Sequence, residues 1–361
     1  MMHGGISARQ RALKTPEILL SVFQRLEVND LNELAQVCKI WSPIAIDIKW
    51  RTSRIQLSRV LARLAPFTAV KSQDDTIRSF ERTDITKEQW DRFQNEYAGK
   101  VTELDIDVSL ASVSRCAVEK LVQAHGGLLF PTLRKLRIDP TFPPDREDWW
   151  TPMAALVACP PLRSVEIAQG DSDDEDMDGI IDAITAMAPH INDVSIETPE
   201  YCPTYTAFSE VTQLTVTGYF DHEAWMACAS LPKLESLTLL EAPSIIYYDH
   251  DVRWKQTYTV TFATLKTLRI DDGYEGRQAM FIVSIFRNAT MPLLQTIDLY
   301  CTRDIDMALI RRYLARGSPL LREINLNGEE EKGPIGIVDV EDEDEGSEDE
   351  GEVDEDSGGD Y

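Results

Sequence analysis

The clearest pattern along the chain is a short alternation of aliphatic and variable positions that returns from residue 101 to residue 326. An aliphatic residue is followed by two variable residues, a second aliphatic residue, one variable residue and a third aliphatic residue. The nine occurrences are VTELDI (101–106), LRKLRI (133–138), LRSVEI (162–167), INDVSI (191–196), VTQLTV (211–216), LESLTL (234–239), LKTLRI (265–270), LQTIDL (294–299) and LREINL (321–326). Their first positions are 20 to 32 residues apart.

Each occurrence predicts one strand of a repeating α/β unit. Its final residues alternate with the period of a strand, and stretches such as DGIIDAITAMA and DIDMALIRRYLARG between the strands have helical character. Repeats of this length are typical of solenoids, in which each unit buries its aliphatic residues by stacking on its neighbours. We therefore expect residues 100–328 to form a curved α/β solenoid with parallel strands.

A different, helical periodicity occupies residues 13–65. After a first helix in TPEILLSVFQRL (15–26), a second helix is expected to start at Asp30, which forms a capping-box spacing with Glu33. Five residues are expected on one face of this second helix: Leu31, Leu34, Val37, Cys38 and Trp41. A helical unit of this size is not stable alone, so its apolar face must be covered by the rest of the chain or by a partner.

The remaining segments connect or flank these two regions. Residues 1–12 are expected to be flexible, and residues 66–99 to form a helical linker. In that linker DITKEQWDRFQNEYAG (84–99) predicts a helix that caps the first edge of the sheet. Residues 329–361 contain 17 Asp and Glu against one Lys, and such a self-repelling segment is expected to be disordered.

Charge and cysteine content narrow the class of protein. The 361 residues carry a formal net charge of −26, of which residues 329–361 contribute −16 and the rest −10. Six cysteines without a CxxC pair predict neither a disulfide framework nor a zinc cluster. No apolar run approaches the ~18 residues of a membrane span. These features predict a soluble intracellular protein of the cytoplasm, the nucleus or both, without direct contact with a membrane.

No pattern typical of catalysis, of a cofactor or of a metal stands out. The five histidines are widely separated, and no glycine-rich nucleotide loop occurs. The stretch DEDMDGIIDAIT (174–185) matches several positions of a calcium-binding EF-hand loop, but Thr185 stands where that loop requires a bidentate Glu. We expect the start of an acidic helix there, and neither a cofactor nor an enzymatic activity in this chain.

The alternation within the strands also predicts a binding surface. Where the aliphatic residues point into the core, the residues between them point outward on the open face of the sheet. Candidate substrate contacts on this face are Lys135, Arg137, Glu166, Arg269, Asp298 and Asn325. The charges are mixed and form no basic stripe, so direct nucleic-acid binding is not expected. The insertion at 241–262 adds three aromatic candidates, namely Tyr247, Tyr248 and Trp254.

The two regions together resemble a known combination of domains. Residues 13–51, LKTPEILLSVFQRLEVNDLNELAQVCKIWSPIAIDIKWR, resemble an F-box through a proline–glutamate–aliphatic opening, two leucine-bearing turns and a Val-Cys-basic-x-Trp signature. The strand patterns are similar to the LxxLxL core of irregular leucine-rich repeats. This combination is similar to the substrate-recognition subunits of SCF-type ubiquitin ligases.

The resemblance implies that the N-terminal helices dock on a Skp-family adaptor, which bridges to a cullin scaffold, while the repeats hold a protein substrate. The implied adaptor contacts are Pro16, Ile18, Leu19, Leu31, Leu34, Val37 and Trp41. The chain would itself catalyse nothing. Two alternatives stay open: an SCF-independent scaffold or acidic-tail binder of basic proteins, and N-terminal helices that pack against the repeats and leave no docking surface.

Overall fold

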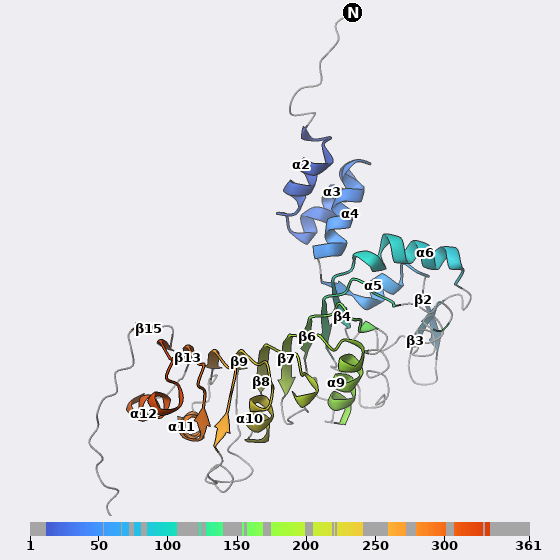
Figure 1. Ribbon diagram of the computed structural model, residues 1–361. Coiled ribbons are helices and arrows are strands. Elements are labelled where there is room, and N and C mark those ends of the chain that lie inside the picture. Colours follow the sequence, from blue (N-terminus) through green and yellow to red (C-terminus); the bar gives the residue numbers. More distant parts are fainter. Residues whose placement is uncertain are drawn as a thin grey trace, which may run out of the picture.

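In the computed structural model, an N-terminal helical unit projects from one end of a long sheet that carries helices along one face (Figure 1). The structure describes residues 12–52, 54–65, 67–71, 76–80, 85–106, 123, 128–139, 154, 157–168, 175–198, 205–218, 220, 222–240, 259–271, 279–300, 307–327 and 329–332.

Three helices form the N-terminal unit: α2 (Pro16–Phe23), α3 (Val28–Val37) and α4 (Trp41–Thr52). Proline suits the first turn of α2, and Glu17 beside it faces the positive end of the helix dipole. The helices enclose a small hydrophobic core formed by Leu19, Phe23, Leu31, Ala45 and Ile48. This core is separate from the much larger core of the sheet.

The second helix differs from its expected form at both ends. It begins at Val28 rather than at Asp30, and no side-chain cap forms there, so the predicted capping box is wrong. It ends at Val37 because Cys38 has an extended backbone, with φ −160° and ψ 163°. The amide of Trp41 donates a hydrogen bond to the Cys38 carbonyl oxygen at 3.1 Å where α4 begins. Val37 and Trp41 therefore lie on different helices.

The nine aliphatic patterns each supply one strand of a single sheet, which confirms the predicted parallel α/β architecture. The sheet order is β1 (Ile55–Gln56), β4 (Glu103–Ile106), β5 (Lys135–Ile138), β6 (Ser164–Ile167), β7 (Asp193–Thr198), β8 (Gln213–Gly218), β9 (Ser236–Leu240), β11 (Thr267–Asp271), β13 (Thr296–Tyr300), β14 (Glu323–Leu326) and β15 (Glu329–Lys332). All neighbouring pairs are parallel except β14 and β15.

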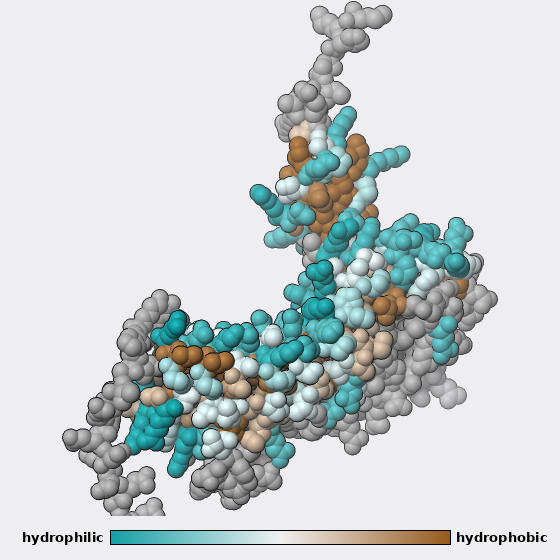
Figure 2. Space-filling model, viewed as in Figure 1, coloured by the Kyte–Doolittle hydropathy of each residue, from teal (hydrophilic) through white to brown (hydrophobic). Residues whose placement is uncertain are grey.

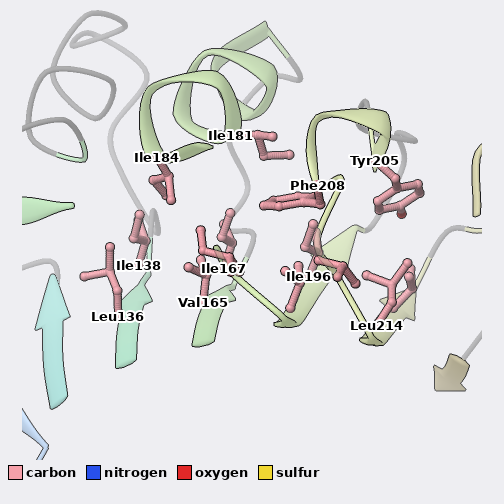
Figure 3. Packing of buried hydrophobic residues seen from close by; sticks show 14 of the residues in the cluster. Leu136, Ile138, Val165, Ile167, Ile181, Ile184, Ile196, Tyr205, Phe208 and Leu214 are labelled. Atoms are coloured by element: carbon pink, nitrogen blue, oxygen red, sulfur yellow. The ribbon is translucent and has the colours of Figure 1, made fainter. Parts of the chain in front are cut away.

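The register keeps equivalent residues of successive strands side by side. Leu136 pairs with Val165, which pairs with Val194, and these residues form one row of the buried ladder. Ile138 pairs with Ile167 in the second row. Figure 3 shows Leu136, Ile138, Val165 and Ile167 pointing toward the helical face, where Ile181 and Ile184 of α9 (Glu175–Met187) pack. Stacking of repeats therefore builds one continuous core.

Further helices follow strands on the same face of the sheet (Figure 1). They are α10 (His222–Ala229), α11 (Ala279–Asn288) and α12 (Met307–Gly317). A short parallel pair, β10 (Val260–Thr261) and β12 (Ala289–Thr290), lies apart from the main sheet. The described residues also include two 3₁₀ turns, η1 (Ala98–Lys100) and η3 (Tyr205–Ala207).

The first edge of the sheet is covered by the segment that precedes β4. It contains α5 (Leu57–Leu61), the antiparallel hairpin of β2 (Phe67–Lys71) and β3 (Thr76–Phe80), and α6 (Lys87–Glu96). The helix expected from DITKEQWDRFQNEYAG is present as α6, and it begins with a capping box between Thr86 and Gln89. Its Trp90 and Phe93 are buried in the core of the sheet. The hairpin was not expected from the sequence.

Two boundaries differ from the expected ones. The sheet begins at β1, within the region assigned to the N-terminal helices, because Ile55 pairs with Leu104 of β4. At the other end, disorder was expected from residue 329 onward, and this is wrong for residues 329–332. Glu329 pairs with Leu326, and Lys332 with Glu323, so these residues form an antiparallel edge strand. The acidic residues beyond 332 lie outside the described residues.

Candidate protein-binding surfaces

The surface of α2 is apolar on more than one side. Leu19 and Phe23 point into the small core and are 3% and 2% exposed. Ile18 and Val22, one turn apart, lie largely outside that core and are 46% and 50% exposed. A helix that is apolar on two sides is expected to be covered on both. The small core covers only one of them.

Exposed apolar residues also occur where α3 meets α4. Val37 at the end of α3 is 58% exposed, and Ile40 just before α4 is also exposed. Trp41 is half-buried. Its indole Nε1–H donates to the carbonyl oxygen of Leu13 at 2.9 Å, and its ring lies edge-on to Phe23 with 5.7 Å between ring centroids. Trp41 therefore fixes both the chain before α2 and the angle between α2 and α4.

Five of the seven predicted adaptor contacts are at least partly exposed, and two are buried. Pro16, Ile18 and Val37 are exposed, and Leu34 and Trp41 are half-buried. Leu19 and Leu31 are a correction to the expected contact set, because they are enclosed in the small core and positioned to hold the helices together.

Sequence reasoning missed other exposed apolar residues of this unit. We define the helical docking face as Ile18, Val22, Leu26, Val37 and Ile40, which are among the exposed apolar residues of this unit. Figure 2 shows hydrophobic residues gathered over this unit, in contrast to the largely hydrophilic surface along the upper side of the sheet. The signal available in the sequence was the density of apolar residues in PEILLSVF, which exceeds what one buried stripe requires.

The docking face is not covered by the sheet. Contact between the helical unit and the rest of the chain is made by the C-terminal half of α4. Trp50 is buried in the core of the sheet and lies edge-on to Tyr97, with ring centroids 5.3 Å apart. Lys100 Nζ lies 3.0 Å from a carboxylate oxygen of Asp47. Helices α2 and α3 stand away from the sheet in Figure 1.

The open face of the sheet carries the second candidate surface. Five of its six predicted residues occupy one register row: Arg137 pairs with Glu166, and Arg269, Asp298 and Asn325 are paired in turn further along. Lys135 lies two positions earlier on β5, in the neighbouring row. These residues alternate with buried aliphatic residues on every strand, which confirms the outward orientation predicted from the pattern.

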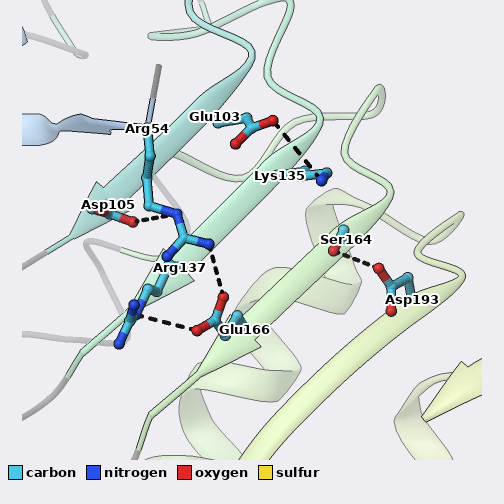
Figure 4. Close-up of polar contacts among 8 residues, drawn as sticks. All are labelled: Arg54, Glu103, Asp105, Lys135, Arg137, Ser164, Glu166 and Asp193. Atoms are coloured by element: carbon cyan, nitrogen blue, oxygen red, sulfur yellow. Dashed lines mark hydrogen bonds and ion pairs between the residues drawn. The ribbon is translucent and has the colours of Figure 1, made fainter. Parts of the chain in front are cut away.

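At the end of this row nearest the N-terminal helices, on β4, β5 and β6, oppositely charged side chains pair with one another (Figure 4). Arg54, which lies just before β1, reaches Asp105 at 3.6 Å and Glu166 at 3.2 Å. The other oxygen of Glu166 lies 3.4 Å from Arg137 Nε. Lys135 and Glu103 form a longer pair at 3.9 Å. A partner that binds here must therefore replace existing ion pairs.

The middle and the C-terminal end of the row differ from this charged cluster. Glu166 is followed in register by Ser195, Thr215 and Thr238, which carry no charge. Beyond them, the guanidinium group of Arg269 lies 4.7 Å from the centre of the Tyr300 ring. Asn325 Nδ2 donates to a carboxylate oxygen of Asp298. The row thus offers hydrogen-bonding groups in its middle and an aromatic–cation contact near its end.

Several sequence-based candidates fall elsewhere. Tyr247, Tyr248 and Trp254 lie outside the described residues. Residues 175–187 form α9, so a regular helix stands where an EF-hand loop would need irregular chain. Among the described residues, no group of three or more His, Cys, Asp and Glu side chains could hold a metal ion. No helix in the described part of the chain is long and apolar enough to cross a membrane.

The cysteines of the described segments divide by burial. Cys38 is exposed and follows the end of α3, which corrects the expectation that it lies on one face of that helix. Cys159 and Cys228 are buried. Burial raises the pKa of the Cys159 thiol, partly offset by backbone hydrogen bonds from Leu162 and to Leu133. Cys38 is therefore an accessible thiol next to Val37 of the helical docking face.

Comparison with known proteins bears on the helical unit. Residues 16–56 match the family model described as F-box-like. The chain contains an F-box-like domain. The match covers α2, α3, α4 and β1, and thus includes every residue of the helical docking face.

Comparisons over more of the chain are less informative. No curated protein is significantly similar to the sequence. The structure is similar to a chain in the crystal structure of a Rad7 and Elc1 complex in yeast, with 12% sequence identity and a TM-score of 0.32. That similarity covers 88% of this chain and 89% of the other. At this TM-score it supports no argument about function.

Proposed function

We propose that this protein is a substrate-recognition subunit of an SCF-type ubiquitin ligase. The observation that carries the proposal is the coincidence of the F-box-like match with an uncovered apolar surface on the same helices. An apolar patch of this kind on a small helical unit is typical of a protein-binding site. The proposed partner is a Skp-family adaptor, through which the chain would join a cullin scaffold.

The docking mechanism is burial of apolar surface. Ile18 and Val22 on α2, with Val37 and Ile40 near the start of α4, would enter the centre of the interface, where burial contributes most. Trp41 holds the start of α4 beside the chain that precedes α2 through its hydrogen bond to Leu13. Leu34 and Pro16 would contact the adaptor at the border of this surface.

The sheet would present the substrate to the ligase. Because Trp50 anchors α4 in the core of the sheet, the docking face and the open face are parts of one connected framework. A substrate bound to the open face would therefore be held at a defined distance from the adaptor. The chain would contribute proximity, and ubiquitin transfer would be performed by other subunits in the cytoplasm, the nucleus or both.

Substrate contact is proposed on the open face, at the row that runs from Arg137 to Asn325. The uncharged stretch with Ser195, Thr215 and Thr238 is favoured over the N-terminal cluster, because charges there already pair with one another. Tyr300 and Arg269 would provide an aromatic and cationic anchor beside it. The substrate itself is expected to be a protein.

A three-component reconstitution tests the adaptor part of the proposal. The full chain, a Skp-family adaptor and a cullin N-terminal domain are mixed and separated by size-exclusion chromatography. The full chain is expected to elute with the cullin only when the adaptor is present. Alkylation of Cys38, which lies beside Val37, is expected to slow in the complex. Elution of the full chain without the adaptor in every mixture would contradict the proposal.

A second candidate function is an SCF-independent binder of basic proteins. The net charge of −26 favours it, because the excess of carboxylates attracts basic partners at low salt. In that case a histone-like basic protein would bind the full chain in the absence of the adaptor. Its binding would be unaffected by substitutions at Ile18 and Val37, and would be lost as the salt concentration rises.

A further inference from the structure

A basic hollow lies at the end of the molecule opposite the F-box-like helices. It has a volume of about 380 Å³ and is bordered by the last turns of α11 and α12 and by β12. Its polar lining residues are Thr259, Arg287, Asn288, Thr290, Arg312, Tyr313 and Arg316. Three arginine residues thus border one cavity in a chain whose net charge is −26.

Two of the three arginines, Arg287 and Arg316, are available to an anion. Arg287, Arg312 and Arg316 are all exposed. Within the described residues, Arg287 and Arg316 form no ion pair. Each of these two lies in the last turn of a helix, where a cation favours the negative end of the dipole. The dipole acts on each helix separately, so it does not explain why Arg287 and Arg316, from two different helices, border the same hollow.

The wall of the hollow is built by close backbone packing. The amide of Met291 donates to the carbonyl oxygen of Gly317 at 2.9 Å, which joins the end of α12 to the residue after β12. A Cβ atom at Gly317 would lie 2.8 Å from the Ala289 carbonyl oxygen. The glycine therefore allows α12 to approach β12, and this approach fixes Arg316 beside Thr290.

The last described strand directs the chain to the same edge of the sheet. Gly317 at the hollow is followed by a short turn that enters β14 at Glu323. β15 runs in the opposite direction, so that its last residue, Lys332, pairs with Glu323. Lys332 therefore lies beside Glu323, which is six residues after Gly317. The chain that follows Lys332 thus starts near the edge of the sheet where the hollow lies.

The segment after Lys332 has the complementary charge. Residues 333–361 contain 14 Asp and Glu and no Lys or Arg, and their first continuous acidic run is EDEDE at 341–345. These residues lie outside the described part of the structure. A run that begins nine residues after Lys332 can lie up to about 30 Å from it, at roughly 3.3 Å per residue. The six residues from Gly317 to Glu323 span at most about 20 Å by the same measure.

We propose that the basic hollow is a binding site for the carboxylates of residues 341–345 of the same chain. Arginine is suited to this role because its guanidinium group pairs with a carboxylate through two parallel hydrogen bonds. The tether raises the local concentration of the acidic run to the millimolar range, so individually weak, exposed pairs are sufficient. The contact is independent of adaptor docking, because it lies at the opposite end of the sheet.

A peptide competition in the full chain tests this site. The anisotropy of a fluorescent peptide of residues 339–356 is measured as the protein is titrated into it. Two full-length proteins are compared: the wild-type chain, and a neutralised chain that carries E341Q, D342N, E343Q, D344N and E345Q. Because the tethered run competes at millimolar effective concentration, the peptide is expected to bind the neutralised chain about tenfold more tightly than the wild type.

The arginines are tested in the neutralised chain. Adding R287Q, R312Q and R316Q is expected to abolish peptide binding, whereas the matched control R59Q, R63Q and R92Q, with three exposed arginines at the other end, retains it. Circular dichroism and thermal unfolding verify that both triple variants are folded. Binding in the neutralised chain is expected to weaken as salt rises from 50 to 300 mM.

Three results would overturn the proposal. Absence of peptide binding to the neutralised chain would show that the hollow does not take carboxylates. Retention of binding in the R287Q, R312Q and R316Q chain would place the peptide on another basic surface. Arginine-dependent binding of equal strength to wild-type and neutralised chains would show that the hollow serves a separate acidic partner instead of residues 341–345.

Discussion

Truncation of the helical docking face separates binding from folding. The double substitution Ile18→Ala and Val37→Ala removes apolar groups that stand outside the small core, so the helical unit should stay folded. Leu31→Ala is the matched comparison. It removes an apolar side chain of similar size that is 1% exposed and lies in the middle of the small core. The two variants are expected to fail in different ways.

The magnitudes follow from exposure. Ile18 is 46% and Val37 58% exposed, and each buried carbon is worth about 0.8 kcal/mol. If an adaptor covers this exposed part, truncation to alanine costs about 1 kcal/mol of binding free energy at each position. Together they lower the affinity roughly 30-fold. Leu31→Ala instead costs about 2–5 kcal/mol of folding free energy, because it leaves a cavity.

Two assays separate these effects. Isothermal titration calorimetry of the full chain with a Skp-family adaptor gives the change in affinity, and hydrogen exchange of residues 16–52 gives the stability of the helical unit. The double variant should show wild-type protection and weaker binding, whereas Leu31→Ala should lose protection. Unchanged affinity in the double variant, with the adaptor bound normally by the wild type, would refute the assignment of the docking face.

Three further outcomes are expected. Gly317→Ala should lower the stability by about 1–3 kcal/mol in thermal unfolding, because its new methyl group would lie 2.8 Å from a backbone oxygen of β12; an unchanged melting temperature would contradict the packing. At pH 8, iodoacetamide followed by mass spectrometry should label Cys38 well before Cys159, whose burial raises its pKa and leaves little thiolate; equal rates would contradict the burial. Trp41→Phe should destabilise residues 13–41 by at least about 0.5–1.5 kcal/mol in hydrogen exchange, because the hydrogen bond to Leu13 is lost and a smaller ring replaces the indole; wild-type protection would contradict the role assigned to Trp41.

The sheet was predictable because its determinants are local. Alternation in a strand sends every second residue to one face, so the aliphatic positions of LRKLRI fix Leu136 and Ile138 inside and Arg137 outside. Repetition then fixes the register, since each repeat can bury its aliphatic residues only against the same positions of its neighbours. The pairing of Arg137 with Glu166 follows from that register.

The ends of the sheet were not predictable from the same pattern. β1 has two residues and β15 consists of Glu, Glu, Glu and Lys, and neither segment shows apolar alternation. Both form because the adjacent strand offers unpaired backbone groups, a condition that only the assembled sheet creates. The hairpin of β2 and β3 likewise pairs within a segment that had been assigned as a helical linker.

The docking face was predicted in location and only partly in composition. In PEILLSVF, Ile18 and Leu19 are adjacent aliphatic residues, and nothing in their chemistry says which one faces the small core. The packing of α2 against α4 decides that Leu19 is enclosed and Ile18 is left outside. The extended backbone at Cys38, which turns the chain from α3 into α4, also depends on that packing.

The account depends most on the docking of the helical unit on a Skp-family adaptor. The direct measurement is a calorimetric titration of the purified adaptor into the full wild-type chain near physiological salt. The account predicts one adaptor per chain with a dissociation constant of about 1 μM or lower, which corresponds to roughly −8 kcal/mol. Absence of a binding signal with both proteins at tens of micromolar would contradict it.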